Sequence, residues 1–332
     1  MTTHILSQAI SAAGATGPVV LAPLAGITDL PFRQLVGSFG ASWVVSEMVA
    51  SQEMVQAKPG VRERAELGFD QEKTAVQLAG RDAKWMAEAA RVVAGNGAAL
   101  IDINMGCPAK KVTSGYSGSA LLRTPDHALS LIEAVVEAVD VPVTLKTRLG
   151  WDHDSLNAAD VARRAEAAGI QLVTIHGRTR CQFYKGQADW DAIRAIKEAV
   201  DIPVIANGDI VDTATAKQAL AASGADGVMI GRGAQGRPWK LAQVQADLTG
   251  VPCVAAPTGN ALIDMVSGHY EAMLMFYDGE LGRRVARKHL GWYMDDAQTA
   301  PALRKRVLTE KDPKQVFALL PDALSQTQEV AA

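Results

Sequence analysis

The sequence predicts an α/β protein, a (β/α)8 TIM barrel followed by a small C-terminal helical domain. Eight short β-branched segments recur over about the first 240 residues, the expected size of such a barrel, and each precedes a loop and a helical stretch. Their mean spacing of about 30 residues is the length of one βα unit. After Ala261 no strand pattern recurs. An open, doubly wound sheet is the alternative, and the even spacing favours a closed barrel.

The predicted strands are short apolar segments. Several are apolar at successive positions, as parallel strands covered on both faces should be. They are Pro18–Ala22, Trp43–Glu47, Thr74–Leu78, Leu100–Asn104, Pro142–Lys146, Leu172–His176, Pro203–Asn207 and Gly227–Ile230.

The helices between these strands carry recognisable ends and apolar stripes. Thr124 and Pro125 supply an N-cap and a first-turn proline. Gly169 and Gly224 fall where two later helices should end. Residues at helical spacing predict one buried stripe after Pro125 and a second one further on. The stripes are Ala128, Leu131, Ile132, Val135, Val136 and Val139, and then Trp190, Ile193, Ile196 and Val200.

The predicted organisation has four parts. They are an N-terminal extension at 1–17, a barrel at 18–245, a linker at 246–259 and a helical domain at 260–332. Prolines and a glycine between Val251 and Gly259 interrupt regular structure there, which indicates the linker. We expect the chain to be a monomer.

The composition is that of an ordinary globular protein, with 48% hydrophobic and 21% charged residues, which excludes disorder, collagen and coiled coil. No apolar segment approaches the ~20 residues of a membrane-spanning helix. The first seventeen residues lack the features of a secretory signal. The three cysteines form no CxxC pair, so neither a zinc ribbon nor a disulfide framework is expected. A cytoplasmic protein without a metal or a membrane partner is the natural expectation.

Charge is distributed unevenly along the chain. The net charge of −3 argues against a general nucleic-acid coat protein. Between Leu281 and Lys314, however, nine Lys and Arg stand against four Asp and Glu, a local net charge of +5. On charge alone, a solvated helical face is the favoured interpretation of this stretch.

Polar residues gather at the carboxyl ends of the predicted strands, where TIM-barrel enzymes place their active sites. This convergence is harder to explain by packing than any single residue is. The strand-end residues are Asp29, Glu47, Gln77, Asn104, Cys107, Lys146, Arg148, His176, Arg178, Asn207, Asp209 and Arg232.

The loops after the last two strands indicate a phosphate site. Asn207-Gly208-Asp209 and Gly231-Arg232-Gly233 supply glycines that let a backbone approach a ligand closely, with Arg232 as a counter-charge. Barrels often bind phosphate between these two loops. Plain turn chemistry is the alternative, and the two loops together favour phosphate.

Three side chains suggest particular chemistry. Lys146 follows an apolar strand, so it is either a Schiff-base nucleophile or a fixed positive charge beside an electron-rich cofactor. Gln77 suits the edge of a heterocycle, although for this residue taken by itself a strand-end cap is the favoured interpretation. Cys107 lies in a long loop rich in Gly and Ser, and a thiol can act as an acid or, once ionised, as a nucleophile. We interpret Cys181 and Cys253 as inert.

Several of these segments together resemble the tRNA-dihydrouridine synthases, over roughly residues 18 to 320. Leu24 stands where the family pattern has Met, a swap of similar volume. The segments are Ala22–Asp29, Asp102–Pro108, His176–Thr179, Asn207–Ile210 and Gly231–Gly233. Cys107–Val112 and Arg287–Tyr293 resemble the bacterial synthase B branch most closely.

The resemblance implies a flavin enzyme that reduces D-loop uridine in tRNA to 5,6-dihydrouridine, with FMN as cofactor and NADPH as reductant. It makes Cys107 the proton donor and suggests position 17 of the tRNA. Asn104 would orient the uracil edge. The residues expected to hold FMN are Pro23, Leu24, Ala25, Gln77, Lys146, His176, Asn207, Gly208, Asp209, Gly231 and Arg232. Those expected to hold tRNA in the helical domain are Arg283, Arg287, Lys288 and Arg304.

Three alternatives share parts of this pattern. An FMN barrel acting on a free pyrimidine or on dihydroorotate needs no basic helical domain. A phosphate-binding isomerase or aldolase would use Lys146 as a Schiff base and bind no flavin. An RNA-binding protein that remodels tRNA would carry a flavin that is only structural.

Overall fold

The computed structural model describes residues 17–58, 60–61, 63–68 and 74–325. Within them the chain forms two compact units. The first contains the residues up to Gly233 together with Leu241–Cys253, and the second contains Ala234–Lys240 and the residues from Val254 onward. The predicted extension at 1–17 lies outside the described residues except for Gly17.

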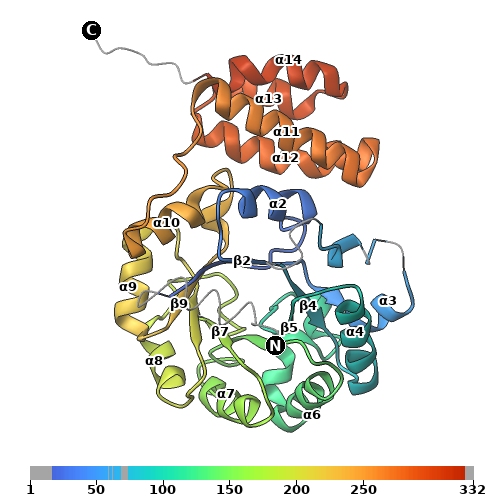
Figure 1. The fold of residues 1–332 in the computed structure, drawn as a ribbon, viewed down its shortest axis with the longest axis vertical. Coiled ribbons are helices and arrows are strands. Elements are labelled where there is room, and N and C mark those ends of the chain that lie inside the picture. Colours follow the sequence, from blue (N-terminus) through green and yellow to red (C-terminus); the bar gives the residue numbers. More distant parts are fainter. Residues whose placement is uncertain (1–16, 59, 62, 69–73, 326–332) are drawn as a thin grey trace. The chain divides into compact units, whose positions relative to one another are not determined.

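The first unit is a closed parallel barrel, which confirms the predicted (β/α)8 fold. Every strand pairing is parallel, and the order β2-β1-β9-β8-β7-β6-β5-β4 closes because β2 also pairs with β4 (Figure 1). The strands are β1 (Val19–Leu21), β2 (Trp43–Val45), β3 (Val49–Ala50), β4 (Thr74–Ala79), β5 (Leu100–Met105), β6 (Val143–Arg148), β7 (Val173–His176), β8 (Val204–Asn207) and β9 (Gly227–Ile230).

The second position of the barrel is occupied by two strand segments, of which the sequence pattern predicted only the first. Both pair with β4, through Val44 opposite Thr74 and Val49 opposite Leu78. Between them Ser46 keeps the connection to β4, because its hydroxyl accepts a hydrogen bond from the Gln77 backbone N–H at 3.0 Å.

Helices surround the strands on the outside of the barrel (Figure 1). The α-helices are α2 (Leu30–Ser38), α3 (Ser51–Val55), α4 (Ala83–Gly95), α5 (Lys110–Thr113), α6 (Pro125–Val136), α7 (Ala158–Ala167), α8 (Asp191–Lys197), α9 (Thr213–Ser223) and α10 (Lys240–Thr249). Short 3-10 turns are η2 (Glu63–Ala65), η4 (Gly118–Arg123) and η5 (Arg232–Ala234).

The predicted helix signals are confirmed in part: Thr124 occupies the N-cap position of α6 but its side chain makes no capping hydrogen bond, and of the second stripe only Ile193 and Ile196 lie within α8. Helix α6 begins at Pro125. Ala128, Leu131, Ile132 and Val135 are buried under it, whereas Val136 and Val139 are half-buried. Gly169 and Gly224 adopt positive φ angles of 101° and 67° just after α7 and α9, as left-handed helix ends require.

The barrel interior changes from apolar to polar along the strands, and this change positions the site. Ala75, Leu100 and Ile205 belong to one buried apolar cluster. Side chains two residues apart on a strand share a face. The next inward positions on the same three strands are therefore occupied by Gln77, Asp102 and Asn207. The polar layer lies toward the carboxyl ends, where the loops emerge.

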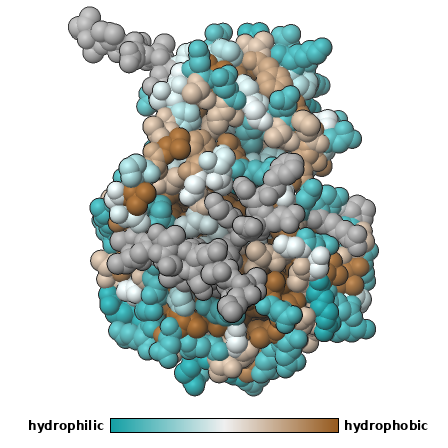
Figure 2. Space-filling view, in the orientation of Figure 1, coloured by the Kyte–Doolittle hydropathy of each residue, from teal (hydrophilic) through white to brown (hydrophobic). Residues whose placement is uncertain are grey.

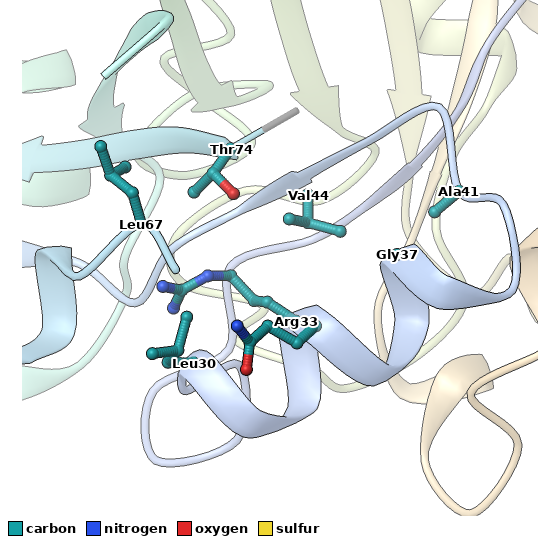
Figure 3. Close-up of a pocket in the computed structure, with 8 residues that line it drawn as sticks. Leu30, Arg33, Gly37, Ala41, Val44, Leu67 and Thr74 are labelled. Carbon is teal, nitrogen blue, oxygen red and sulfur yellow. The ribbon is translucent and has the colours of Figure 1, made fainter. Parts of the chain in front are cut away.

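A small pocket on the outer side of the barrel lies between α2 and β2, and Figure 3 shows the Arg33 guanidinium pointing toward Leu67. Arg33 donates from Nη1 to the Thr28 carbonyl at 2.7 Å and from Nη2 to the Glu66 carbonyl. The remaining lining is largely apolar. This pocket ties the chain around Glu66 to α2 and is separate from the polar layer.

The second unit contains the small helical domain that the sequence predicted. Its helices are α11 (Gly259–Tyr277), α12 (Gly279–Asp296), α13 (Pro301–Thr309) and α14 (Pro313–Leu324). They share an apolar core that includes Val266, Met273, Leu290 and Leu320. In the part of the chain that is described, no helix is long and apolar enough to cross a bilayer. On the face shown in Figure 2, hydrophilic residues cover much of the barrel's outer helices.

Candidate active site

The polar layer of the barrel brings together side chains from neighbouring strands. Gln77 on β4, Asn104 on β5, Lys146 on β6 and Asn207 on β8 are each at most 8% exposed. In the barrel register Asn104 lies opposite Lys146. The structure therefore collects at one mouth four of the residues that the sequence singled out.

A directed chain of hydrogen bonds runs through this layer. The Gln77 amide donates from Nε2 to Asp102 Oδ2 at 2.7 Å, and its Oε1 accepts from Asn104 Nδ2 at 2.7 Å. An ionised carboxylate can only accept, so Asp102 determines which end of the Gln77 amide faces Asn104. Thr144 donates its hydroxyl to the other carboxylate oxygen at 2.7 Å. Burial raises the pKa of Asp102, and the hydrogen bonds from Gln77 and Thr144 oppose that rise.

The same chain ends at Cys107. Asn104 Oδ1 accepts from the Cys107 backbone N–H at 3.0 Å, and the Cys107 carbonyl accepts from the Ser119 hydroxyl at 2.8 Å. Gly118 has a φ of +60°, and a Cβ there would lie 2.9 Å from the Cys107 carbonyl, so the turn needs glycine. Cys107 is half-buried. Side chains therefore hold both its backbone N–H and its backbone carbonyl.

Lys146 is a buried cation held by Asn207. Its Nζ donates to Asn207 Oδ1 at 3.0 Å, and Asn207 Nδ2 donates to the Met229 carbonyl at 2.8 Å, which sets the amide orientation. Burial and the positive charge of Arg148 lower the pKa of Lys146 to about 8. An ammonium group has three donors, of which Asn207 takes one.

A second polar cluster lies after β7 and β8. The Asp209 carboxylate accepts hydrogen bonds from Arg178 and Arg232, each at 3.1 Å, and from the Ala188 N–H at 2.8 Å. Partial burial raises the pKa of Asp209, but the hydrogen bonds from Arg178 and Ala188 outweigh it and keep the pKa below its usual value. Gly208 before it has a φ of +113°. The predicted phosphate loop therefore uses its carboxylate to hold two arginines in place.

His176 lies beside this cluster, with Nε2 3.3 Å from Arg178 Nη1. Burial and the positive charges of Lys146, Arg148 and the neighbouring arginines lower the pKa of His176 well below its usual value. The imidazole is therefore neutral at pH 7, and Nε2 faces a donor.

The loop after β1 lies at the same mouth. Leu24 donates its backbone N–H to the Thr28 hydroxyl at 2.9 Å, and the Gly26 N–H donates to the Glu47 carboxylate. A Cβ on Gly231 would lie 3.5 Å from the Leu24 side chain, so the two loops are adjacent. Pro23 and Ala25 flank Leu24 in this turn, with Ala25 exposed.

Sequence reasoning did not assign roles to several residues that build this site. Arg148 is 1% exposed and donates from Nε to the Gly106 carbonyl at 2.8 Å and from Nη1 to the Thr179 carbonyl at 2.9 Å. Burial lowers the pKa of Arg148 to about 10. Asp102 and Arg178 were likewise unassigned. Their signal was present, since charged residues at the ends of buried strands are unusual.

The predicted tRNA-binding residues lie on α12 and α13 in the second unit. Arg304 donates to both carboxylate oxygens of Asp295, at 2.6 and 3.0 Å, and Arg283 lies 3.7 Å from Glu280. The Arg287 and Lys288 side chains are half-buried. The more exposed cations on and between α12, α13 and α14 are Arg284, Lys305, Arg306, Lys311 and Lys314.

The chemistry of the barrel mouth suits an anionic, hydrogen-bonding ligand. Lys146, Arg148, Arg178 and Arg232 supply positive charge, while the amides offer donors and acceptors. This combination fits a flavin nucleotide, which carries both a phosphate and a heterocyclic edge. Among the described residues no group of three or more His, Cys, Asp or Glu could hold a metal ion.

The closed barrel and its polar mouth define a TIM-barrel enzyme whose active site is formed at the carboxyl ends of the strands. Residues 20–329 match the family model described as dihydrouridine synthase. The chain belongs to the dihydrouridine synthase family.

Relatives in several bacteria are similar over most of their length. A probable tRNA-dihydrouridine synthase from Rhodobacter capsulatus is 61% identical over 312 residues, covering 94% of this chain and 96% of its own. One from Rhizobium leguminosarum is 56% identical, with coverage of 92% and 95%. The tRNA-dihydrouridine synthase B of Vibrio cholerae is 46% identical, with coverage of 86% and 89%.

Solved structures at low sequence identity share the fold. A 2-naphthoyl-CoA reductase matches with a TM-score of 0.55 at 13% identity, over 71% of this chain and 50% of its own. A histamine dehydrogenase matches with a TM-score of 0.54 at 13% identity, over 77% and 49%. At this identity the likeness concerns the barrel alone.

The buried Lys146 predicts a pH-dependent contribution to stability. Below about pH 8 the ammonium is charged in the folded and the unfolded chain, so the folded state bears the full cost of burying charge. Between about pH 8 and the unfolded value of 10.5, only the unfolded chain keeps the proton, so the free energy of unfolding rises.

Comparison with Lys146→Met isolates this effect, because other titrating groups are common to both proteins. From pH 7 to 10, we expect the wild type to gain about 2 to 3 kcal/mol relative to the variant in chemical denaturation. A difference that does not change with pH would contradict the assignment.

Proposed function

We propose that this chain reduces the C5=C6 bond of a D-loop uridine in tRNA to 5,6-dihydrouridine, with bound FMN and with NAD(P)H as reductant. Membership of the dihydrouridine synthase family supports this reaction. The structural observation that carries the proposal is the placement of Cys107 beside the buried polar layer that contains Asn104 and Lys146.

The residues of the mouth are suited to hold FMN. Lys146, Gln77 and Asn207 line its interior, and the loops at Pro23–Ala25, Asn207–Asp209 and Gly231–Arg232 surround it. His176, which is neutral, offers a ring edge without added charge. Asp209 acts through Arg178 and Arg232, whose guanidinium groups it orients toward an anionic group. The flavin, when bound, supplies the hydride that adds to C6 of the uracil ring.

Cys107 donates the proton that completes the reduction at C5. Hydride addition to a double bond conjugated with a carbonyl leaves negative charge toward C5 and O4, and a positioned acid must quench it. The Cys107 backbone is fixed by Asn104 and Ser119, so the point from which its side chain starts is fixed at the mouth. The positive charge of Lys146 stabilises negative charge that develops nearby.

The substrate must present the uridine outside its base stack, because a stacked base cannot enter the barrel mouth. The surrounding phosphates require positive charge, which the stretch from Leu281 to Lys314 supplies. Arg283, Arg287, Lys288 and Arg304 remain the proposed tRNA contacts. Because Arg304 is already paired with Asp295, the exposed Lys305 and Arg306 are the stronger candidates on α13.

Three finer assignments complete the proposal. We infer NADPH as the reductant, position 17 of the D loop as the target, and a monomer acting in the cytoplasm. Position 17 rests on the likeness to synthase B, of which the Vibrio cholerae relative is an example, and NADPH rests on the likeness to the family as a whole. The cytoplasm rests on the three cysteines, which form no CxxC pair.

Replacing Cys107 tests the reaction and its acid together. With purified protein, FMN, NADPH and unmodified tRNA, we expect the wild type to form dihydrouridine, measured by mass spectrometry of nucleosides. Cys107→Ala should form it at least ~100-fold more slowly, because a positioned acid contributes about that much. NADPH-dependent flavin reduction should be unchanged.

Cys253→Ala is the matched control, since this exposed cysteine lies outside the barrel mouth. Equal product from wild type and Cys107→Ala would contradict the role of Cys107. Turnover of free uracil or dihydroorotate, with no product from tRNA, would contradict the substrate.

Reversing charge on α13 tests the proposed tRNA contact. Lys305→Glu/Arg306→Glu should weaken binding of unmodified tRNA and reduce the slope of log Kd against log salt by about 1 or more, because fewer counterions are released. Fluorescence anisotropy over a range of KCl concentrations measures both. Lys217→Glu on α9, which is also exposed, is the control. The same affinity and slope in both variants would leave α13 as an ordinary solvated face.

A further inference from the structure

Three consecutive loops of the barrel meet at its rim beside the Cys107 loop. Arg180, after β7, donates its backbone N–H to the Gly150 carbonyl at 3.0 Å, after β6. The Arg180 guanidinium lies 3.4 Å from the Thr113 hydroxyl, at the end of α5 and after β5. The three loops therefore form one continuous surface a few residues beyond Cys107.

Two arginines of this surface stack on one indole. The guanidinium carbon of Arg180 lies 4.6 Å from the centroid of the Trp151 ring, and that of Arg123 lies 5.0 Å from it. Stacking on an aromatic ring holds a guanidinium in place while leaving its N–H groups free to bind. Trp151 thus fixes two positive charges at the rim.

These two charges have no acidic partner among the described residues. Neither Arg123 nor Arg180 forms a salt bridge there, and Arg180 Nε is buried without a hydrogen-bond partner. Asp152, which directly follows Trp151, is engaged by the Ser155 hydroxyl at 2.6 Å and by the Asp154 N–H at 3.2 Å, and Asp126, three residues after Arg123, pairs with Arg164 at 2.7 Å. Like charges held together without a counter-ion favour an anionic ligand.

Exposed residues on α5 and just after it extend the surface toward Cys107. Lys110 and Lys111, three and four residues beyond Cys107, are exposed. Tyr116 is 70% exposed and has a φ of +57°. Its backbone N–H donates to the Thr113 carbonyl at 3.2 Å, so it lies beside the residue that contacts Arg180.

We propose that this surface, the rim cluster of Lys110, Lys111, Tyr116, Arg123, Trp151 and Arg180, binds the RNA strand next to the uridine that enters the barrel. Each stacked guanidinium group takes a backbone phosphate, for which its planar donors are suited. Tyr116 provides an exposed aromatic face on which a neighbouring unstacked base can lie. The inference rests on the proposed function and assigns part of the grip on tRNA to the barrel itself.

The combination of residues favours RNA over a protein or a free nucleotide. The cluster combines cations with one exposed ring, Tyr116, and one half-buried ring, Trp151, and basic residues beside aromatic rings are typical of single-stranded nucleic-acid sites. Lys110 and Lys111 follow Cys107 by three and four residues, so they lie close to any RNA whose uridine reaches that cysteine. A bound NADPH phosphate is the other source of the same anionic chemistry, and the experiment separates the two.

Arg123→Gln/Arg180→Gln removes both stacked charges. For unmodified tRNA without turnover, we expect Kd to rise at least tenfold and the slope of log Kd against log salt to fall by 1 to 2, as loss of two phosphate contacts requires. The rate of flavin reduction by NADPH should stay the same. Arg180→Lys keeps the charge but loses the planar stacking, so its Kd for tRNA should lie between those of the wild type and the double variant.

Two further variants make the test independent of local folding. Lys110→Gln/Lys111→Gln changes only exposed side chains and should also weaken tRNA binding. Arg163→Gln, an exposed arginine of α7 paired with Asp160, should not. The inference is overturned if the rim variants bind tRNA like Arg163→Gln, or if only their reaction with NADPH changes. Wild type that binds tRNA but forms no dihydrouridine would instead refute the proposed function.

Discussion

The site depends above all on one buried carboxylate. Asp102 lies beneath the barrel mouth and accepts hydrogen bonds from Gln77 and Thr144. By fixing the direction of the Gln77 amide, it fixes that of Asn104, whose oxygen then faces the backbone of Cys107. A buried polar network of this kind is stable only when each member is satisfied. The position of the proposed proton donor therefore follows from a buried acid on the strand that leads into the Cys107 loop.

The mouth has an excess of positive charge because it contains more basic side chains than carboxylates to pair with them. Asp209 neutralises part of the charge of Arg178 and Arg232, and Asp102 lies near Lys146. Burial and, after it, the neighbouring positive charges lower the pKa values of Lys146 and His176. An anionic cofactor would stabilise the positive charge that remains at the mouth. The barrel thus holds charges that cost free energy to bury and that a bound ligand can compensate.

Much of the fold could be predicted from local pattern, because β-branched segments and helix caps reflect local physics. The eight barrel strands follow from that pattern, whereas β3 does not, since Ser46 and Glu47 interrupt its apolar run. The sequence could predict that the mouth residues lie together, because the carboxyl ends of all barrel strands meet at one rim. Their partners could not, because the bond between Gln77 and Asp102, or between Arg304 and Asp295, depends on distances between elements far apart in the chain. The pairing of Arg304 is why the exposed Lys305 and Arg306 are better candidates for RNA contact.

A charge transposition tests the role of Asp102 most directly, with the free energy of unfolding as the measurement. Gln77→Glu alone places two buried carboxylates against each other and should cost about 3 kcal/mol or more at pH 8. Adding Asp102→Asn supplies an amide that donates to Glu at position 77 and accepts from Thr144, and it leaves Asn104 donating as before. The free energy of unfolding of the double variant should return to within about 1 kcal/mol of the wild-type value. The reason is that every hydrogen bond between Thr144, position 102, position 77 and Asn104 is restored. A double variant no more stable than Gln77→Glu would contradict the account.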